Sequence, residues 1–206
     1  GNLKPDCPHR FIFMCLQDHI DQYRVDEKLR QWCPGCIVVP VKEVTEGAAC
    51  TVLLSEKYID SEDPLMIANS DQWVDIDINT YLKAGADADG LIMTMKANDP
   101  KWSYVRFDSN GEVCEVVEKQ VVSDEATVGI YNFAHGKDFV AYAHKMIEAN
   151  LRVNGEFYVA PVYNQMVADN GKIEIYNIGT DEKGMYGLGI PEDLERFLRL
   201  EVCGKA

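Results

Sequence analysis

The sequence has 206 residues, of which 47% are hydrophobic and 26% charged, enough for one α/β domain with a substantial core. Its formal net charge of −14 argues against DNA, RNA and anionic membranes as partners, because proteins that bind phosphate backbones present a basic face. A nucleotide ligand is not excluded, since a metal ion and a few lysines can neutralise its phosphates locally. No apolar run reaches the roughly 18 residues that span a bilayer, and residues 1–10 are too polar for a secretory signal, so we expect a cytoplasmic protein.

The first part of the chain alternates apolar runs with helical patterns. The apolar runs predict buried strands at 11–16, 36–41 and 65–68, and the segments between them predict helices at 18–32 and 48–59. Strands and helices in this order form right-handed crossovers and a largely parallel sheet. Ligands of such sheets bind beyond the carboxyl ends of the strands, which directs attention to the residues after the third strand.

The pattern changes after residue 102, where Asn110-Gly111 between two alternating segments indicates a β-hairpin. The other expected elements are a helix at 78–84, a strand at 91–95, hairpin strands at 104–107 and 113–117, a strand at 126–133, helices at 139–153 and 160–168, a strand at 172–178 and a helix at 191–202. No repeat or low-complexity linker separates the two halves. We therefore predict a single α/β domain over residues 1–206, with a mixed, mainly parallel central sheet flanked by helices in a Rossmann-like arrangement.

The seven cysteines include one suggestive spacing, Cys33-Pro34-Gly35-Cys36. Such a pair can form a redox couple or half of a zinc site, but no second CxxC and no His-x-x-x-His accompany it. The pair ends a predicted helix and begins a predicted strand, which reverses the order of thioredoxin-like motifs. We interpret it as a helix-terminating turn.

Three aspartates follow the third apolar strand within seven residues. Asp71 ends the strand, where a carboxylate can hold Mg²⁺, and Asp75 and Asp77 come just before the helix at 78–84. Helix capping is a common role of Asp at that position, and we favour it for Asp77. For Asp75, capping and metal binding are equally favoured. Asp71 lies too far ahead of the helix to cap it, so it is the main candidate for a metal ligand.

Three other segments are weak signals by themselves. Thr45-Glu46-Gly47 is either a helix start or a turn whose glycine lets the backbone approach a flat ring. Glu118-Lys119 follows the hairpin and is either a binding pair or surface charge. Gly187-Leu188-Gly189, ahead of Pro191, is compatible with a plain strand-to-helix turn.

The order of these segments resembles the sugar-phosphate nucleotidyltransferase family, the relatives of glucose-1-phosphate thymidylyltransferase. The resemblance covers about residues 11–198 and is nearest to the branch found in capsule and lipopolysaccharide gene clusters. It implies an enzyme that transfers a nucleoside monophosphate from a nucleoside triphosphate to a sugar 1-phosphate and releases pyrophosphate, for surface-polysaccharide precursor synthesis. Such chemistry relies on positioning and charge neutralisation, with Mg²⁺ as the cofactor.

The resemblance implies phosphate and nucleotide roles for three residues. Gly47 corresponds to the family's turn beside the nucleotide base. Asp71, in Asn-Ser-Asp-Gln, corresponds to the aspartate that holds Mg²⁺. Lys119 corresponds to the lysine that binds the sugar phosphate. Asp71 and Lys119 are therefore the expected catalytic residues.

Three further residues correspond to the sugar side of the family's site. Glu118 corresponds to a glutamate that binds sugar hydroxyls. Gly129, in Thr-Val-Gly-Ile-Tyr, corresponds to a strand glycine next to the sugar. Glu156, in Gly-Glu-Phe-Tyr, corresponds to an acidic residue that often contacts the sugar.

The sequence departs from the family in three places. Gln120 replaces the proline after Glu-Lys, and Gly187 stands where many relatives have a second Mg²⁺-binding aspartate, a role open to Asp181 or Asp75. The family's opening strand and Gly-rich loop, which wrap the triphosphate through backbone N–H groups and basic side chains, are absent. We therefore expect an amino-terminally truncated domain whose sheet has a gap where that strand would lie.

Two other functions stay open at this point. The first is a metal-dependent glycosyltransferase of related fold, with Asp75-Ile76-Asp77 as its metal motif. The second is a non-catalytic module that binds a sugar nucleotide or a partner subunit. The sequence does not identify the base or the sugar, and it is compatible with a homo-oligomer.

Overall fold

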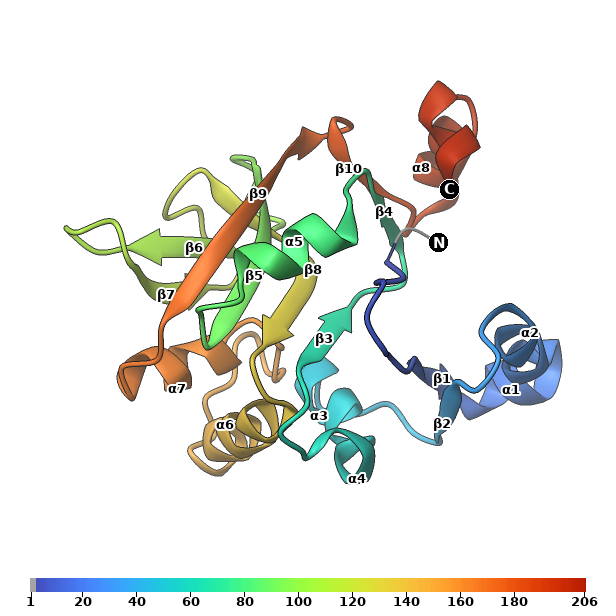
Figure 1. The fold of residues 1–206 in the computed structure, drawn as a ribbon, viewed down its shortest axis with the longest axis horizontal. Helices are drawn as coiled ribbons and strands as arrows, with labels where there is room; N and C mark the ends of the chain where they lie inside the picture. The colour runs from blue at the N-terminus through green and yellow to red at the C-terminus, as the bar shows by residue number, and fades with distance from the viewer. Residues whose placement is uncertain (1–2) are drawn as a thin grey trace.

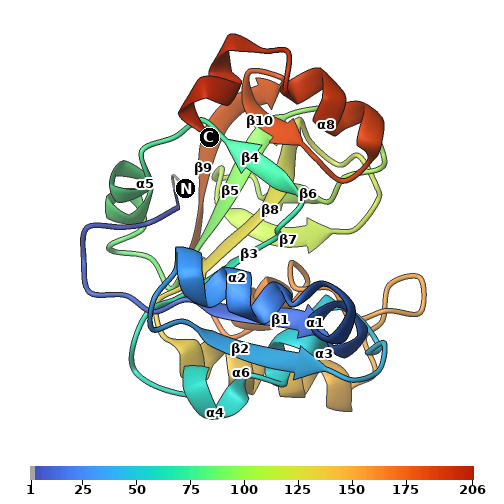
Figure 2. The same cartoon turned by 90° about the vertical axis from the view of Figure 1, so that its right-hand side faces the viewer.

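The computed structural model describes residues 3–206 (Figures 1 and 2). In chain order the elements are β1 (Ile12–Leu16), α1 (Gln17–Tyr23), α2 (Val25–Trp32), β2 (Ile37–Val41), α3 (Ala48–Leu53), α4 (Glu56–Ile59), β3 (Leu65–Ala68), β4 (Gln72–Val74), α5 (Ile78–Ala84), β5 (Gly90–Lys96), β6 (Tyr104–Phe107), β7 (Val113–Val117), β8 (Glu125–Phe133), α6 (Gly136–Glu148), α7 (Val162–Ala168), β9 (Ile173–Asp181), β10 (Gly184–Gly187), α8 (Pro191–Phe197) and the 3₁₀ helix η1 (Glu201–Lys205). These elements form two sheets of very different size.

The smaller sheet belongs to a β–α–α–β unit at the amino-terminal end of the chain. β1 and β2 pair in parallel, with Ile12 opposite Ile37, as expected for two apolar runs joined by a helical crossover. The predicted helix at 18–32 is split, because Arg24 adopts the left-handed conformation (φ 52°) and ends α1 where α2 begins. The sequence around Arg24 contains no glycine or proline that would predict this break.

The other strands form one eight-stranded mixed sheet in the order β4-β10-β9-β5-β8-β6-β7, and β3 also pairs with β8. This confirms the predicted α/β class with a central mixed sheet flanked by helices. The expectation that the sheet is mainly parallel is wrong. Only β9 pairs in parallel, with β5 and β10, and the other five pairings are antiparallel. Three of these five antiparallel pairings involve β8, which runs antiparallel to its neighbours β3, β5 and β6.

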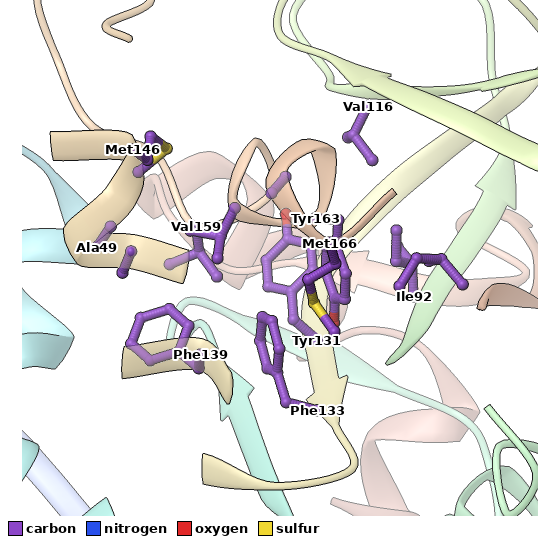
Figure 3. Close-up of a cluster of buried hydrophobic side chains, with 14 of the residues drawn as sticks. Ala49, Ile92, Val116, Tyr131, Phe133, Phe139, Met146, Val159, Tyr163 and Met166 are labelled. Atoms are coloured by element: carbon purple, nitrogen blue, oxygen red, sulfur yellow. The ribbon is translucent and has the colours of Figure 1, made fainter. Parts of the chain in front are cut away.

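Alternate residues of β5 and β8 enter two hydrophobic cores on opposite faces of the eight-stranded sheet. The first core lies under α6 and α7, where the ring of Phe133 stacks on that of Tyr163 with 4.6 Å between the ring centroids (Figure 3). The second core includes Met93 and Met95 of β5 and is covered by α5 through Ile78. The larger sheet is therefore packed on both sides.

Strand β1 of the smaller sheet and strand β3 of the larger sheet do not pair with each other. Ile12 of β1 and Ile67 of β3 pack against the same core, yet the two strands belong to different sheets. Within residues 3–206, β1 pairs only with β2 and β3 only with β8, so one edge of each strand has no neighbour. Figure 1 shows β1 and β2 standing apart from β3. Within the described residues, β1–β2 and the eight-stranded sheet are therefore separate sheets.

Two smaller expectations can also be compared with the structure. The segment from Cys33 to Cys36 is a turn closed by a hydrogen bond from the Cys36 N–H to the Cys33 carbonyl (3.1 Å), which confirms the turn interpreted from the sequence. None of the helices in the described part of the chain is both long enough and apolar enough to cross a bilayer.

Candidate functional site

Strand β8 changes its hydrogen-bonded neighbour at Gly129, from β6 before this residue to β3 after it. Before that point, Thr127 donates its N–H to the Ser103 carbonyl beside β6 (2.8 Å), and after it, Ile130 pairs with Ala68 of β3. Gly129 has a φ of 75°, and a Cβ there would lie 2.3 Å from the Asn69 side-chain nitrogen. Glycine is therefore required by both the backbone conformation and the close approach of Asn69. β6 therefore pairs with β8 before this residue and β3 pairs with β8 after it.

Asp71 lies just beyond the carboxyl end of β3, two residues after Asn69, which contacts Gly129. Its side chain is exposed, as expected, and its carbonyl accepts a hydrogen bond from the Leu188 N–H (2.7 Å). A Cβ on Gly189 would lie 3.1 Å from the Asp71 Oδ2 atom. The turn at 187–189 thus packs against Asp71, and Gly189 lies so close to the carboxylate that a larger residue would crowd it.

The neighbouring aspartates have other partners. Asp77 caps α5, accepting from the Asn79 N–H (3.0 Å) and the Thr80 hydroxyl (2.7 Å), and these bonds hold the pKa of its carboxyl below the usual range. The capping role favoured from the sequence is confirmed. Asp75 forms an ion pair with Lys205 (2.9 Å). The two carboxylates of the Asp-x-Asp segment are therefore engaged at different places.

Gly47 and Glu156 are far apart in sequence but line the same hollow, which has a volume of about 440 Å³. Gly47 has a φ of 136°, and a Cβ there would lie 2.4 Å from the Phe157 carbonyl oxygen. The glycine thus permits close contact between two backbone segments. The hollow is lined by apolar residues of β1, β2 and the segment after β2, together with two threonines, a glycine and a glutamate: Met14, Leu16, Val41, Val44, Thr45, Gly47, Thr51 and Glu156.

Glu118 and Lys119 lie at the end of β7. The Glu118 carboxylate accepts a hydrogen bond from the Ser103 hydroxyl (2.6 Å). Burial raises the pKa of this carboxyl, and the Ser103 bond and the charge of Lys119 offset part of that effect. The Lys119 side chain is exposed, with its ammonium 5.6 Å from the centre of the Tyr158 ring. Lys119 is therefore brought toward the segment that carries Glu156.

Two comparisons bear on the family of this chain. The sequence model of the family described as "Nucleotidyl transferase" matches residues 10–159, which is well over half of the chain. The chain belongs to the nucleotidyl transferase family. The matched range contains all six predicted site residues, from Gly47 to Glu156, and it ends before the turn at 187–189.

Several solved structures share the fold of this nucleotidyl transferase. A nucleoside-diphosphate-sugar pyrophosphorylase from Vibrio cholerae RC9 superposes with a TM-score of 0.80 and 21% identity, covering 93% of this chain and 81% of that one. An inositol-1-phosphate CTP transferase from T. maritima superposes with a TM-score of 0.65 and 18% identity, covering 89% and 71%. A candidate glucose-1-phosphate thymidylyltransferase from Bacillus anthracis gives 0.66 and 17%, covering 90% and 73%. No curated protein sequence matches the chain.

The candidate metal ligand Asp71 can be compared with the donors that Mg²⁺ requires. Among residues 3–206, no three His, Cys, Asp or Glu side chains are grouped so that they could hold a metal ion. Asp181, one candidate for a second ligand, lines a separate small hollow of about 70 Å³ together with Gly187. Mg²⁺ commonly binds one or two carboxylates and completes its shell with water and substrate phosphates. The exposed Asp71 carboxylate fits that pattern as a single protein ligand.

The structure divides the six predicted residues into neighbouring groups. Asp71 and Gly129 lie around Asn69, Gly47 and Glu156 share a hollow, and Lys119 faces Tyr158. No hydrogen bond or ion pair within residues 3–206 links the Asp71 carboxylate to Lys119 or to Glu118. A substrate that contacts all these groups would have to reach from Asp71 to Lys119 and to the hollow at Gly47 and Glu156.

Two polar neighbours of the site were not predicted from the sequence. Ser103 holds the Glu118 carboxylate, and Arg152 contacts Glu46 next to Gly47. Ser103 precedes a hairpin strand and Arg152 follows a helix, so neither stands in a recognisable motif. Only the pairing of distant segments reveals them.

Proposed function

We propose that this nucleotidyl transferase joins a nucleoside triphosphate to a sugar 1-phosphate, with release of pyrophosphate. The observation that carries the proposal is that Gly47 and Glu156 line one hollow, although more than a hundred residues separate them. The resemblance assigns one of these residues to the nucleotide and the other to the sugar. Their sharing of a hollow supports a site where both substrates meet.

The chemistry requires a place for each part of the two substrates. The apolar walls from Met14, Leu16 and Val41 suit the face of a base. Glu118 and Glu156 can accept hydrogen bonds from sugar hydroxyls. Lys119, with its ammonium over Tyr158, is available to the sugar phosphate as a compact positive charge.

The reaction consists of attack by a sugar phosphate oxygen on the α-phosphorus and departure of pyrophosphate. Both reactants are anionic, so their approach needs positive charge more than it needs a proton donor. A bound Mg²⁺ would supply part of that charge, and Asp71 is the residue that would hold it. Lys119 would neutralise the incoming phosphate and orient its oxygen. We place the product in the synthesis of surface-polysaccharide precursors.

The glycosyltransferase alternative needs Asp75 and Asp77 at one metal. The structure engages Asp77 as a helix cap and pairs Asp75 with Lys205. This separation favours Asp71 as the metal ligand, and with it the nucleotidyltransferase.

The test is a screen for pyrophosphate release with several nucleoside triphosphates and sugar 1-phosphates in the presence of Mg²⁺. Asp71→Asn should abolish Mg²⁺-dependent release, with a loss of at least about a hundredfold. Asp75→Asn is the matched control, because it removes a nearby exposed charge and should leave the rate unchanged. The reverse outcome, loss with Asp75→Asn and retention with Asp71→Asn, would favour the glycosyltransferase motif.

A further inference from the structure

The hollow that contains Gly47 and Glu156 is closed by two segments that meet through their backbones. The Phe157 N–H donates to the Glu46 carbonyl (2.8 Å), and the Ala49 N–H donates to the Phe157 carbonyl (3.0 Å). We call these two bonds the seam. The seam lies directly behind Gly47, whose missing side chain lets the segments approach.

Arg152 contacts both sides of the seam. Its guanidinium forms an ion pair with the Glu46 carboxylate on one side and lies 4.1 Å from the centre of the Phe157 ring on the other. Its Nε donates to the Asn150 side chain (2.7 Å). A planar guanidinium can hydrogen-bond in its plane while it stacks on an aromatic face, which a lysine ammonium cannot do.

The same arginine also fixes the turn that presents Glu156. Val153 and Glu156 form a β-bridge around Asn154-Gly155, whose φ angles of 50° and 84° are those of a tight hairpin turn. Arg152 Nη1 donates to the Gly155 carbonyl (3.2 Å). Glu156, at the end of this turn, is thereby held at the rim of the hollow.

We propose that Arg152 is a positioning residue that locks the seam, so that the Glu46–Gly47 turn and the Glu156–Tyr158 segment form one binding hollow. This inference rests on the proposed function for the identity of the ligands, but not for the lock itself. The Glu46 side chain is 63% exposed and that of Arg152 33% exposed. An ion pair with such exposure adds little to global stability, so its effect should be local.

Hydrogen exchange measured by NMR on the ligand-free protein tests the lock without reference to activity. Arg152→Ala should accelerate exchange of the Phe157 and Ala49 amides by at least about tenfold. The Ile92 amide in β5 should exchange at its wild-type rate, and the urea unfolding midpoint should not move. Arg106→Ala is the matched control, because Arg106 forms an exposed ion pair with Glu115 (2.8 Å) on the hairpin, away from the seam. Wild-type exchange of both seam amides in Arg152→Ala would overturn the proposal.

Ligand binding then tests what the lock does. The probes are glucose 1-phosphate and dTTP with Mg²⁺, measured by calorimetric titration. Arg152→Ala should weaken both probes by about tenfold, and Arg152→Lys should recover only part of that loss, since it keeps the charge but not the stacking. If Arg152→Ala weakens binding and also lowers the urea unfolding midpoint, the binding loss comes from global destabilisation. That result would overturn a positioning role. If the wild-type protein binds neither probe, the proposed function fails, while the amide measurement still decides the lock.

Discussion

The small β1–β2 unit and the eight-stranded sheet differ in how deeply they are buried, although both contribute to the candidate site. Between residues 3 and 41 only Val41 is buried, whereas β5 buries six of its seven residues and β8 eight of nine. The apolar wall of the hollow thus comes from the weakly packed unit, and Glu156 comes from the well-packed body. Ligand-binding elements are often drawn from the less stable parts of a protein. We therefore expect the β1–β2 unit to open at a lower free energy than the sheet.

The largest expected effect contrasts two tryptophans. Trp73 in β4 is 8% exposed and packs against Tyr186 and Phe197, whereas Trp32 in α2 is 72% exposed. Trp73→Ala should lower the free energy of unfolding by about 3–5 kcal/mol, because it leaves a cavity in a packed cluster. Trp32→Ala should change it by less than about 0.5 kcal/mol. Urea denaturation of both variants measures the contrast, and equal effects would show that the two regions are equally packed.

A second, intermediate effect concerns the link between the two regions. Gly47 and Gly111 both have positive φ, but a Cβ would strike the Phe157 backbone at Gly47 and meet nothing within 4 Å at Gly111. Gly111→Ala should cost about 1 kcal/mol from backbone strain alone. Gly47→Ala should cost about 2–3 kcal/mol, because strain and the clash add, and its seam amides should exchange faster. Equal costs in urea denaturation would mean that the seam accommodates the added methyl group without a further loss of stability.

The smallest expected effect is a pH dependence on the sheet side of the site. Burial raises the pKa of Glu118, so the folded state disfavours its charged form relative to the unfolded chain. Below the ordinary glutamate pKa the group is neutral in both states and carries no penalty, and stability falls as pH rises through the raised folded pKa. Glu118→Gln, which keeps an acceptor for Ser103, should therefore be slightly more stable than wild type at about pH 7.

The measurement for Glu118 is the difference in unfolding free energy between the two proteins across pH. That difference should shrink to nothing by about pH 4, as the wild-type carboxyl becomes protonated. A difference that stays constant with pH would assign it to packing instead.

Most elements could be predicted from the sequence because their signals are local. The apolar runs at 11–16, 36–41 and 65–68 became β1, β2 and β3 within one residue, and Asn110-Gly111 marks the β6–β7 hairpin. The break at Arg24 was not predictable, since an arginine rarely adopts positive φ. The sheet's direction was also missed, because the antiparallel pairing of β8 with three strands is set by tertiary packing.

For the site, the sequence located candidate residues but not the contacts that explain them. Asp71 and Asp77 could be separated by their distance from α5, and the structure supports that separation through the Asp77 cap. The glycine at 47 has a reason that no local pattern contains, the backbone of Phe157. The roles predicted for Asp71 and Lys119 stay predictions until the variants are measured.

The position of β8 also has a consequence for the order in which the chain folds during synthesis. Each of β3, β4 and β5 pairs only with strands that come later in the chain. β3 pairs with β8, β4 pairs with β10, and β5 pairs with β8 and β9. These early strands therefore leave the ribosome with their edges unpaired, and such edges are prone to wrong pairing. Closing long loops slows the pairing further. The sheet is completed only when the last quarter of the chain has emerged, so we expect the early strand edges to stay unpaired, and open to wrong pairing, until β9 and β10 have been made.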